Sequence, residues 1–191
     1  IIPLLSNTDP DYISNREKIE VKENNQTIYI EPPFDEVPFL WKNFSQKNYV
    51  TYFSEEWLQS TFYYLKFGFK EQPTDFYLRP FWVALYKSLS YTPTIFNSNP
   101  KPCYYNKLLH KISFDWLLSF ENFYKNLEEK YRIENIPRFG FFKINEMSHD
   151  HLERLFWIDK DLNQLFLNLF TKKFLDNTLF ILMSDHGHRF H

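Results

Sequence analysis

The sequence predicts an α/β fold in which helices flank a parallel sheet. The clearest evidence is the last third of the chain, where an apolar strand, an amphipathic helix and a second apolar strand follow one another. The second strand, residues 178–183, is apolar on both faces, as a parallel strand covered by helices on each side requires. With 191 residues, of which 43% are hydrophobic and 24% charged, the chain is long enough for one buried core.

The first 47 residues predict a loop-rich lead-in, and residues 48–191 an α/β core portion. Five prolines mark the lead-in, which offers one strand-like run, residues 26–31. Residues 49–53 then predict a buried strand, and Ser54 can cap a helix beginning at Glu55 and Glu56. Acids at a helix start are usually solvated, and we favour that interpretation for both over a catalytic one.

Residues 68–82 combine glycine, two prolines and dense aromatics, which predicts a packed, specific loop. An ion pair between Asp75 and Arg79 is the structural explanation that we expect for their presence there. A long helix is predicted over residues 106–130, because apolar side chains recur at spacings of three and four. They are Leu108, Leu109, Ile112, Trp116, Phe120, Phe123 and Leu127.

The last third predicts a β-α-β unit. Residues 139–144 form its first strand, residues 145–151 a polar turn, residues 159–175 the helix and residues 178–183 the second strand. The helix buries a stripe of Leu162, Leu165, Phe166, Leu169, Phe170 and Phe174.

Composition narrows the function classes. Twenty-two basic and 24 acidic side chains give a net charge of -2 without a basic cluster, which argues against a nucleic-acid partner. Aromatic residues make up 21% of the chain but are spread along it, which indicates a compositional bias and not a binding platform. The sequons at Asn25 and Asn43 suit glycosylation in a secreted or lumenal protein. No apolar run long enough to span a membrane is visible.

The clearest chemical signature follows the last predicted strand, at Ser184, Asp185, His186 and Gly187. Ligands of parallel sheets bind beyond the carboxyl ends of the strands. A carboxylate and an imidazole that converge at a turn are good ligands for zinc or a similar divalent ion. A capping aspartate beside a surface histidine is the alternative explanation for so short a motif.

The phrase from Asn177 to His188 resembles the late metal motif of the alkaline phosphatase/sulfatase superfamily. The sequence is most similar to one branch, an animal family called domain of unknown function 229. The matching stretches, in order, are residues 38–41 with 49–51, 68–69, 73–81, 103–104, 146–150 and 184–187. They cover most of the chain from residue 38, and the resemblance implies an alkaline-phosphatase-like sheet that is incomplete at both ends, within a partial domain over residues 1–191.

The resemblance implies further site residues. Phosphodiesterase-like members of the superfamily carry an aspartate and a histidine four residues apart that bind a second metal, and Asn145 and His149 match that spacing. His149 is therefore an expected ligand, while Asn145 replaces the carboxylate and is a weaker ligand for a hard ion. For His149 and His151, helix capping or solvent exposure is the alternative. The nucleophile is expected outside this chain, Ser6 being a poor candidate, and Cys103 is expected to pair with a cysteine of a missing segment.

These expectations define two competing functions. The first is a metal-dependent hydrolase of phosphate or sulfate esters, with zinc as the expected metal and calcium or magnesium as alternatives, acting on a small-molecule, glycan or lipid ester. As a fragment, this chain is expected to be inactive by itself. The second is an inactive extracellular interaction module with the same fold, which Asn145 favours. Either is expected in the secretory lumen or outside the cell, with any membrane anchor in a missing segment.

Overall fold

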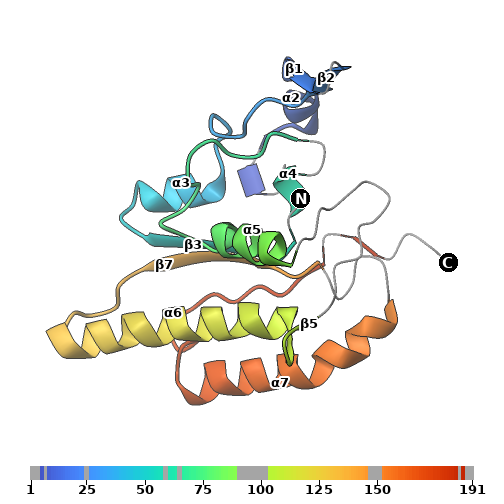
Figure 1. The fold of residues 1–191 in the computed structure, drawn as a ribbon. Helices are drawn as coiled ribbons and strands as arrows, with labels where there is room; N and C mark the ends of the chain where they lie inside the picture. Colours follow the sequence, from blue (N-terminus) through green and yellow to red (C-terminus); the bar gives the residue numbers. More distant parts are fainter. Residues whose placement is uncertain are drawn as a thin grey trace. The chain divides into compact units, whose positions relative to one another are not determined.

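The computed structural model describes residues 5–6, 8–23, 26–57, 60–63, 66–89, 103–145, 152–184 and 186–187. The chain forms two compact units. The first comprises Ile1–Pro93 and Pro137–Phe142, and the second comprises Thr94–Ile136 and Lys143–His191. Helices and strands are interspersed along the sequence (Figure 1), so the mixed α/β class that the sequence predicts is confirmed.

A three-stranded parallel sheet lies at the centre of the first unit. Its strands stand in the order β4 (Phe76–Tyr77), β3 (Val50–Glu55) and β7 (Arg138–Lys143). In the β3–β4 pair, Tyr52 is opposite Phe76 and Phe53 is opposite Tyr77. The Val50 amide donates to the Pro137 carbonyl over 2.9 Å, which joins the starts of β3 and β7. Both strands predicted at residues 49–53 and 139–144 are therefore confirmed.

The predicted loop at residues 68–82 is only partly correct. β4 lies within it, and helix α5 (Arg79–Ser88) begins before it ends. Pro80 occupies the first turn of α5, where the missing N–H of proline removes no helical hydrogen bond. The sequence did not predict β4 or the start of α5, because each covers too few residues of this loop to show a strand or helix periodicity.

Aromatic side chains form the core of the first unit. Trp41, in α3 (Leu40–Ser45), stacks on Phe39 at 4.3 Å and on Phe53 of β3 at 5.7 Å between ring centroids. The buried members are Leu5, Ile13, Phe34, Val37, Phe39, Trp41, Phe53 and Phe62. Part of the high aromatic content thus fills this core, where stacked and edge-on pairs stabilise beyond their buried area.

Two short elements precede this core in the sequence. Asp9 caps helix α2 (Pro10–Ser14) by accepting from the Asp11 amide over 2.8 Å. An antiparallel hairpin then joins β1 (Ile19–Glu23) to β2 (Gln26–Ile30), with Ile19 opposite Ile30. The strand-like run at residues 26–31 is confirmed by β2.

The second unit is built on two helices that pack against each other, α6 (Leu109–Tyr131) and α7 (Leu155–Thr171) (Figure 1). Both helices are predicted by the sequence, but α7 begins and ends four residues earlier than expected. It follows a 3-10 turn, Leu152–Arg154, and stops where Lys173 takes a left-handed conformation at φ 59°. The Phe174 amide then donates back to the Leu169 carbonyl over 2.9 Å, a common way to end a helix. Two short strands, β5 (Cys103–Tyr104) and β6 (Lys107–Leu108), pair just before α6.

The strand predicted over residues 178–183 is not formed. This segment has no regular secondary structure, and the side chains of Leu179 and Ile181 are 88% and 69% exposed. An apolar run becomes a strand only when a neighbour supplies backbone hydrogen-bond partners, and none of the described strands pairs with it. The apolar pattern of residues 178–183 indicates that the segment favours a strand conformation. Whether it pairs depends on the rest of the sheet.

Candidate functional site

The carboxyl ends of β3 and β4 form the most promising site in the first unit. Strand β3 ends at Glu55, and Glu56 follows it; their side chains are only 4% and 0% exposed. The prediction that both acids are solvated at a helix start is therefore wrong. Burying carboxylates costs free energy unless they have partners, and buried acids beyond the end of a parallel strand are typical of binding or catalytic sites.

Glu55 is buried because β3 continues through it instead of giving way to a helix at Ser54. The next helix, α4 (Ser60–Tyr63), starts five residues later. Glu55 Oε1 accepts hydrogen bonds from the amide and the hydroxyl of Thr61, over 3.0 and 2.7 Å. Trp57, which lies between Glu55 and Thr61 in the sequence, has a φ of 115°, a strained value for a bulky residue. Such strain recurs at functional sites, where a chain must turn sharply to position its side chains.

Tyr77 lies close enough to Glu55 for that charge to affect its pKa, and Tyr63 and Arg79 lie beside Tyr77. The hydroxyls of Tyr63 and Tyr77 are 3.2 Å apart, and Tyr63 Oη also accepts from the Phe69 amide over 3.3 Å. The Arg79 guanidinium lies over the Tyr63 ring, 3.5 Å from its centroid. Burial, then the Tyr63 hydroxyl and its hydrogen bond, raise the pKa of Tyr77, and the charge of Arg79 opposes them without cancelling the shift. Tyr77 therefore stays a protonated hydrogen-bond donor at any physiological pH.

Gly68 makes this arrangement feasible. Its φ of 78° is in the left-handed region, and a Cβ there would lie 1.8 Å from Tyr63 Cε1. Only glycine combines that backbone conformation with so close an approach of the tyrosine ring.

These residues line an open pocket of about 430 Å³. The pocket is lined by Tyr63, Tyr77, Arg79, Pro80, Val83, Ala84 and Lys87. The last four lie at helical spacings on one face of α5, whose other face buries Trp82, Leu85 and Tyr86 in the protein. We call this the α5 pocket.

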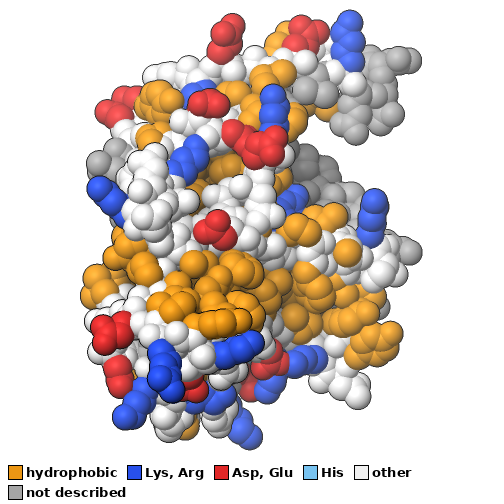
Figure 2. Space-filling view, turned by 90° about the vertical axis from the view of Figure 1, so that its left-hand side faces the viewer, with side chains coloured by type: hydrophobic (Ala, Val, Ile, Leu, Met, Phe, Trp, Pro, Cys, Tyr) orange, Lys and Arg blue, Asp and Glu red, His pale blue; other side chains and the backbone are white. Residues whose placement is uncertain are grey.

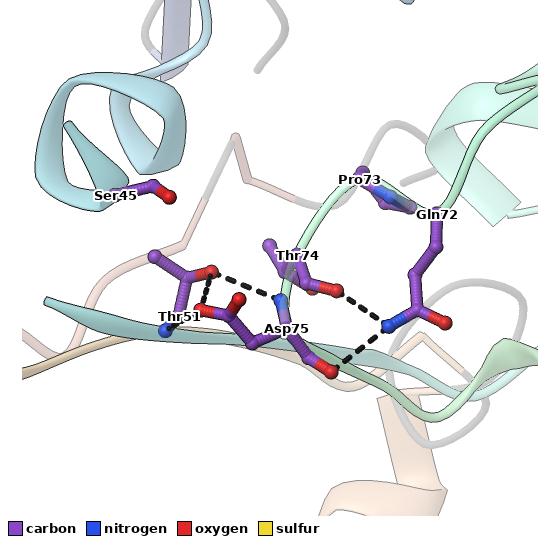
Figure 3. Close-up of a pocket in the computed structure, with 6 residues that line it drawn as sticks. All are labelled: Ser45, Thr51, Gln72, Pro73, Thr74 and Asp75. Carbon is purple, nitrogen blue, oxygen red and sulfur yellow. Dashed lines mark hydrogen bonds between the residues drawn. The ribbon is translucent and has the colours of Figure 1, made fainter. Parts of the chain in front are cut away.

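A second pocket, of about 420 Å³, lies at the opposite ends of the strands (Figure 3). Thr51, the second residue of β3, lines this pocket. Its amide and its hydroxyl both donate to Asp75 Oδ2 over 2.8 Å. Gln72 Nε2 donates to the carbonyls of Thr74 and Asp75. The Asp75–Arg79 ion pair that we expected is not formed, because Asp75 joins the starts of β3 and β4 while Arg79 stacks on Tyr63. We interpret this polar network as structural.

Of the predicted metal ligands, His186 and Asn145 lie among the described residues, whereas Asp185 and His149 lie outside them. His151, the other histidine of the predicted turn, also lies outside them. His186 sits in an exposed turn in which Ser184 Oγ donates to the His186 carbonyl over 2.6 Å. His186 Nδ1 is 2.6 Å from the Gly187 carbonyl oxygen, which can only accept. Nδ1 therefore carries the proton, and in the neutral ring Nε2 has the lone pair. Asn145 is buried, two residues after β7.

Within the described part of the chain, no three His, Cys, Asp or Glu side chains are grouped in a way that would hold a metal ion. Of the sequons, Asn43 and Ser45 are exposed on α3, whereas Asn25 lies outside the described residues. Cys103 is exposed on β5 and has a free thiol. None of the described helices is long and apolar enough to cross a membrane.

A buried titratable cluster of the second unit was missed by sequence reasoning. His110 of α6 is fully buried, and its Nε2 lies 2.8 Å from Asp161 Oδ2 of α7. Lys111 Nζ donates to the other oxygen of Asp161 over 2.8 Å. A histidine next to a lysine at a helix start gives no signal by itself, since the partner acid is 51 positions away.

The fold and this site define a mixed α/β protein whose polar groups gather at the carboxyl ends of parallel strands. The chain belongs to the family described as "Protein of unknown function (DUF229)", whose model matches residues 1–191. No curated protein and no solved structure shows significant similarity to it.

Proposed function

We propose that this protein is a metal-dependent hydrolase of phosphate or sulfate esters, with a fold of the alkaline phosphatase/sulfatase type. The observation that carries the proposal is the hydrogen bond between His186 Nδ1 and the Gly187 carbonyl. It selects the tautomer in which Nε2 is the ligand atom, and metal-binding histidines usually have their other nitrogen held in this way. In the sequence, Asp185 directly precedes His186.

The donor chemistry of these residues fits a divalent ion. Asp185 and His186 would hold one ion, with zinc the best match to a carboxylate and imidazole set and magnesium or calcium as alternatives. His149 would contribute to a second position, where Asn145 is a weak ligand for a hard ion. A bound ion of this kind would polarise an ester oxygen and stabilise negative charge that develops on it.

Within the first unit, the α5 pocket by itself has hydrogen-bond donors suited to the anionic group of an ester. Arg79 and the tyrosine hydroxyls of the α5 pocket lie at the carboxyl ends of β3 and β4, where ligands of parallel sheets bind. A guanidinium and neutral hydroxyls bind and orient tetrahedral oxyanions by charge-assisted hydrogen bonds. Glu55, held by Thr61, would fix the loop that carries these donors. The reacting ester is small, or the anionic end of a glycan or lipid.

The test is metal content and turnover of the full protein, measured on 4-nitrophenyl phosphate, bis(4-nitrophenyl) phosphate and 4-nitrophenyl sulfate. We expect about one metal ion or more per chain by mass spectrometry and turnover of one ester. An Asp185→Ala/His186→Ala variant should lose the metal and at least about tenfold in turnover. Asp159→Ala, which removes an exposed carboxylate of α7, is the control and should change neither. A well-folded parent with no metal and no turnover would contradict the proposal.

A second candidate is an extracellular interaction module with the same fold. It is favoured by exposed apolar side chains, among them Leu179 and Ile181. Figure 2 shows apolar side chains gathered in patches on the surface that faces the viewer. Contiguous apolar patches on a protein surface typically mark interaction sites. The exposed sequon at Asn43 is consistent with the secretory pathway for either candidate. Metal-free, inactive parent protein that binds a partner would favour this function.

A further inference from the structure

The α5 pocket combines two cations with an apolar wall. Arg79 lies at one end of the helical face and Lys87 at the other, with Pro80, Val83 and Ala84 between them. A solvent-facing helix stripe is normally polar, so an apolar stripe between two charges is unusual. The described residues provide no carboxylate within ion-pair distance of either cation.

Two hydrogen-bond donors in this pocket have no acceptor within the described part of the chain. Arg79 Nη1 is buried, and no described group accepts a hydrogen bond from it. The hydroxyls of Tyr63 and Tyr77 have two protons but share one hydrogen bond, and Tyr63 Oη already accepts from the Phe69 amide. One phenolic proton is therefore left without an acceptor among the residues that the structure describes, whichever tyrosine donates to the other. Buried donors are almost always satisfied, so the orphaned Arg79 Nη1 beside a spare tyrosine hydroxyl indicates a missing acceptor.

We propose that the α5 pocket binds an organic oxyanion, a molecule with an apolar body and one sulfate, phosphate or carboxylate group. Arg79 and the spare tyrosine hydroxyl bind the anionic oxygens, since a guanidinium presents its N–H groups as a fork that matches two oxygens of one group. The apolar body lies along Pro80, Val83 and Ala84, and Lys87 adds charge at the rim. The pocket volume of about 430 Å³ is within the usual range for small-ligand sites.

The charges and the apolar wall of the α5 pocket together determine which molecules should bind most tightly. Glu55 is close enough to Tyr77 to contribute to its raised pKa, after burial and the effects of Tyr63. Its Oε1 accepts hydrogen bonds from Thr61, and no ion pair between Glu55 and Arg79 occurs among the described residues. Inorganic sulfate uses the donors but not the apolar wall, and benzyl alcohol uses the wall but not the donors. Each should bind more weakly than a molecule with both parts.

Calorimetric titration of the full protein with 4-nitrophenyl sulfate tests the pocket. A chelator is present throughout, so this binding site, which does not rest on the metal proposal, is measured without turnover. We expect saturable binding that is tighter than that of inorganic sulfate and of benzyl alcohol. Arg79→Gln should weaken it at least about tenfold, as the loss of a charged hydrogen bond does. Lys87→Gln should weaken it by about threefold, as the loss of a charge at a solvated rim does.

Lys47→Gln is the matched control, because Lys47 is exposed in the same unit and the substitution changes the net charge equally. It should leave the binding unchanged. Circular dichroism verifies that each variant is folded. If Arg79→Gln does not fold, the binding affinity of Lys87→Gln, a substitution at an exposed position, tests the proposal. Absence of binding to the wild-type protein, or equal binding by the Lys87→Gln and Lys47→Gln variants and by folded Arg79→Gln, would overturn the proposal.

Discussion

At the scale of single residues, two positions accept only glycine, because any larger side chain would collide with a neighbouring aromatic ring. Gly68 is one, because its backbone is left-handed and the Tyr63 ring occupies the space of a Cβ. Gly140 of β7 is another, where a Cβ would lie 1.9 Å from Cζ of Tyr52. Both glycines let an aromatic ring pack directly on the backbone, and three glycines in 191 residues leave few such places.

Substituting Gly68 by alanine should destabilise the protein by about 2 kcal/mol or more, the sum of backbone strain and displacement of a ring. Urea denaturation, followed by circular dichroism, measures the change in the free energy of unfolding. Gly187→Ala is the control, because a Cβ at Gly187 would meet nothing within 4 Å. Equal stability of the two variants would show that Tyr63 does not pack against Gly68 in solution.

At the scale of secondary structure elements, helices α6 and α7 are joined by the His110–Asp161–Lys111 cluster. Burial lowers the pKa of His110, and its hydrogen bond to Asp161 opposes that shift without reversing it. Burial alone would raise the pKa of Asp161, but the hydrogen bonds from Lys111 and His110 outweigh it and lower the pKa. The neutral histidine donates through Nε2, and the carboxylate is ionised.

These shifts predict a loss of stability on acidification in two steps. Above the usual histidine pKa of 6.5, His110 is neutral in both folded and unfolded chains and contributes no pH dependence. Below it, the unfolded chain takes up a proton that the folded one resists, so stability falls until the lowered pKa is passed. The contribution of Asp161 to stability is complete above the usual aspartate pKa of 3.8 and is lost as the pH falls through its lowered pKa.

Urea denaturation of the wild type and of His110→Gln between about pH 7.5 and pH 5 measures the first step, which should be smaller in the variant. An identical pH profile in both would contradict it.

Asp161→Ala should be more harmful than a surface substitution. It leaves the buried His110 N–H without an acceptor and Lys111 without its ion pair, which should cost about 1–3 kcal/mol. Asp159→Ala on the exposed face of the same helix is the control, with an expected change within about 0.5 kcal/mol. Thermal and urea unfolding of both variants at pH 7 provide the comparison, and a loss no larger than that of the control would show that the cluster does not hold α6 and α7 together.

At the scale of the whole molecule, exposed apolar surface is the dominant feature. The side chains at residues 179–183 are all at least 45% exposed, although they are the most apolar run in the chain. An unpaired apolar segment of this kind favours association with another chain.

We expect the chain in solution to associate increasingly with concentration. Leu179→Lys/Ile181→Lys should reduce that association, because two charges in the segment oppose strand pairing between molecules. Light scattering after size-exclusion chromatography measures it across a range of concentrations. Tyr105→Lys, a substitution at a side chain 86% exposed in the same unit, should leave the association unchanged; a monomer at every concentration would show that the segment is covered in solution.

The sequence by itself determined most of the regular elements. Strands β3 and β7 and helices α6 and α7 were predictable because their signals are local: an apolar run between turns, or a stripe every three to four residues. The Asp-His-Gly motif was proposed from its position after an apolar run and from the family resemblance, and it stays a prediction. The ends of helices were less predictable, since α7 stops at a left-handed lysine that no propensity favours.

Tertiary structure alone decided whether those elements pair and which side chains they bury. Residues 178–183 have every local property of a strand, yet pairing requires a neighbour that local sequence does not specify. The sequence predicted that Glu55 and Glu56 are solvated. In the structure β3 extends through Glu55, and Thr61 donates hydrogen bonds to the Glu55 carboxylate. The α5 pocket joins Tyr63 to residues 77–87 through the pairing of β3 with β4, so its donors converge only in the folded chain. Its chemistry depends on burial and hydrogen bonding between distant residues, which periodicity and composition do not encode.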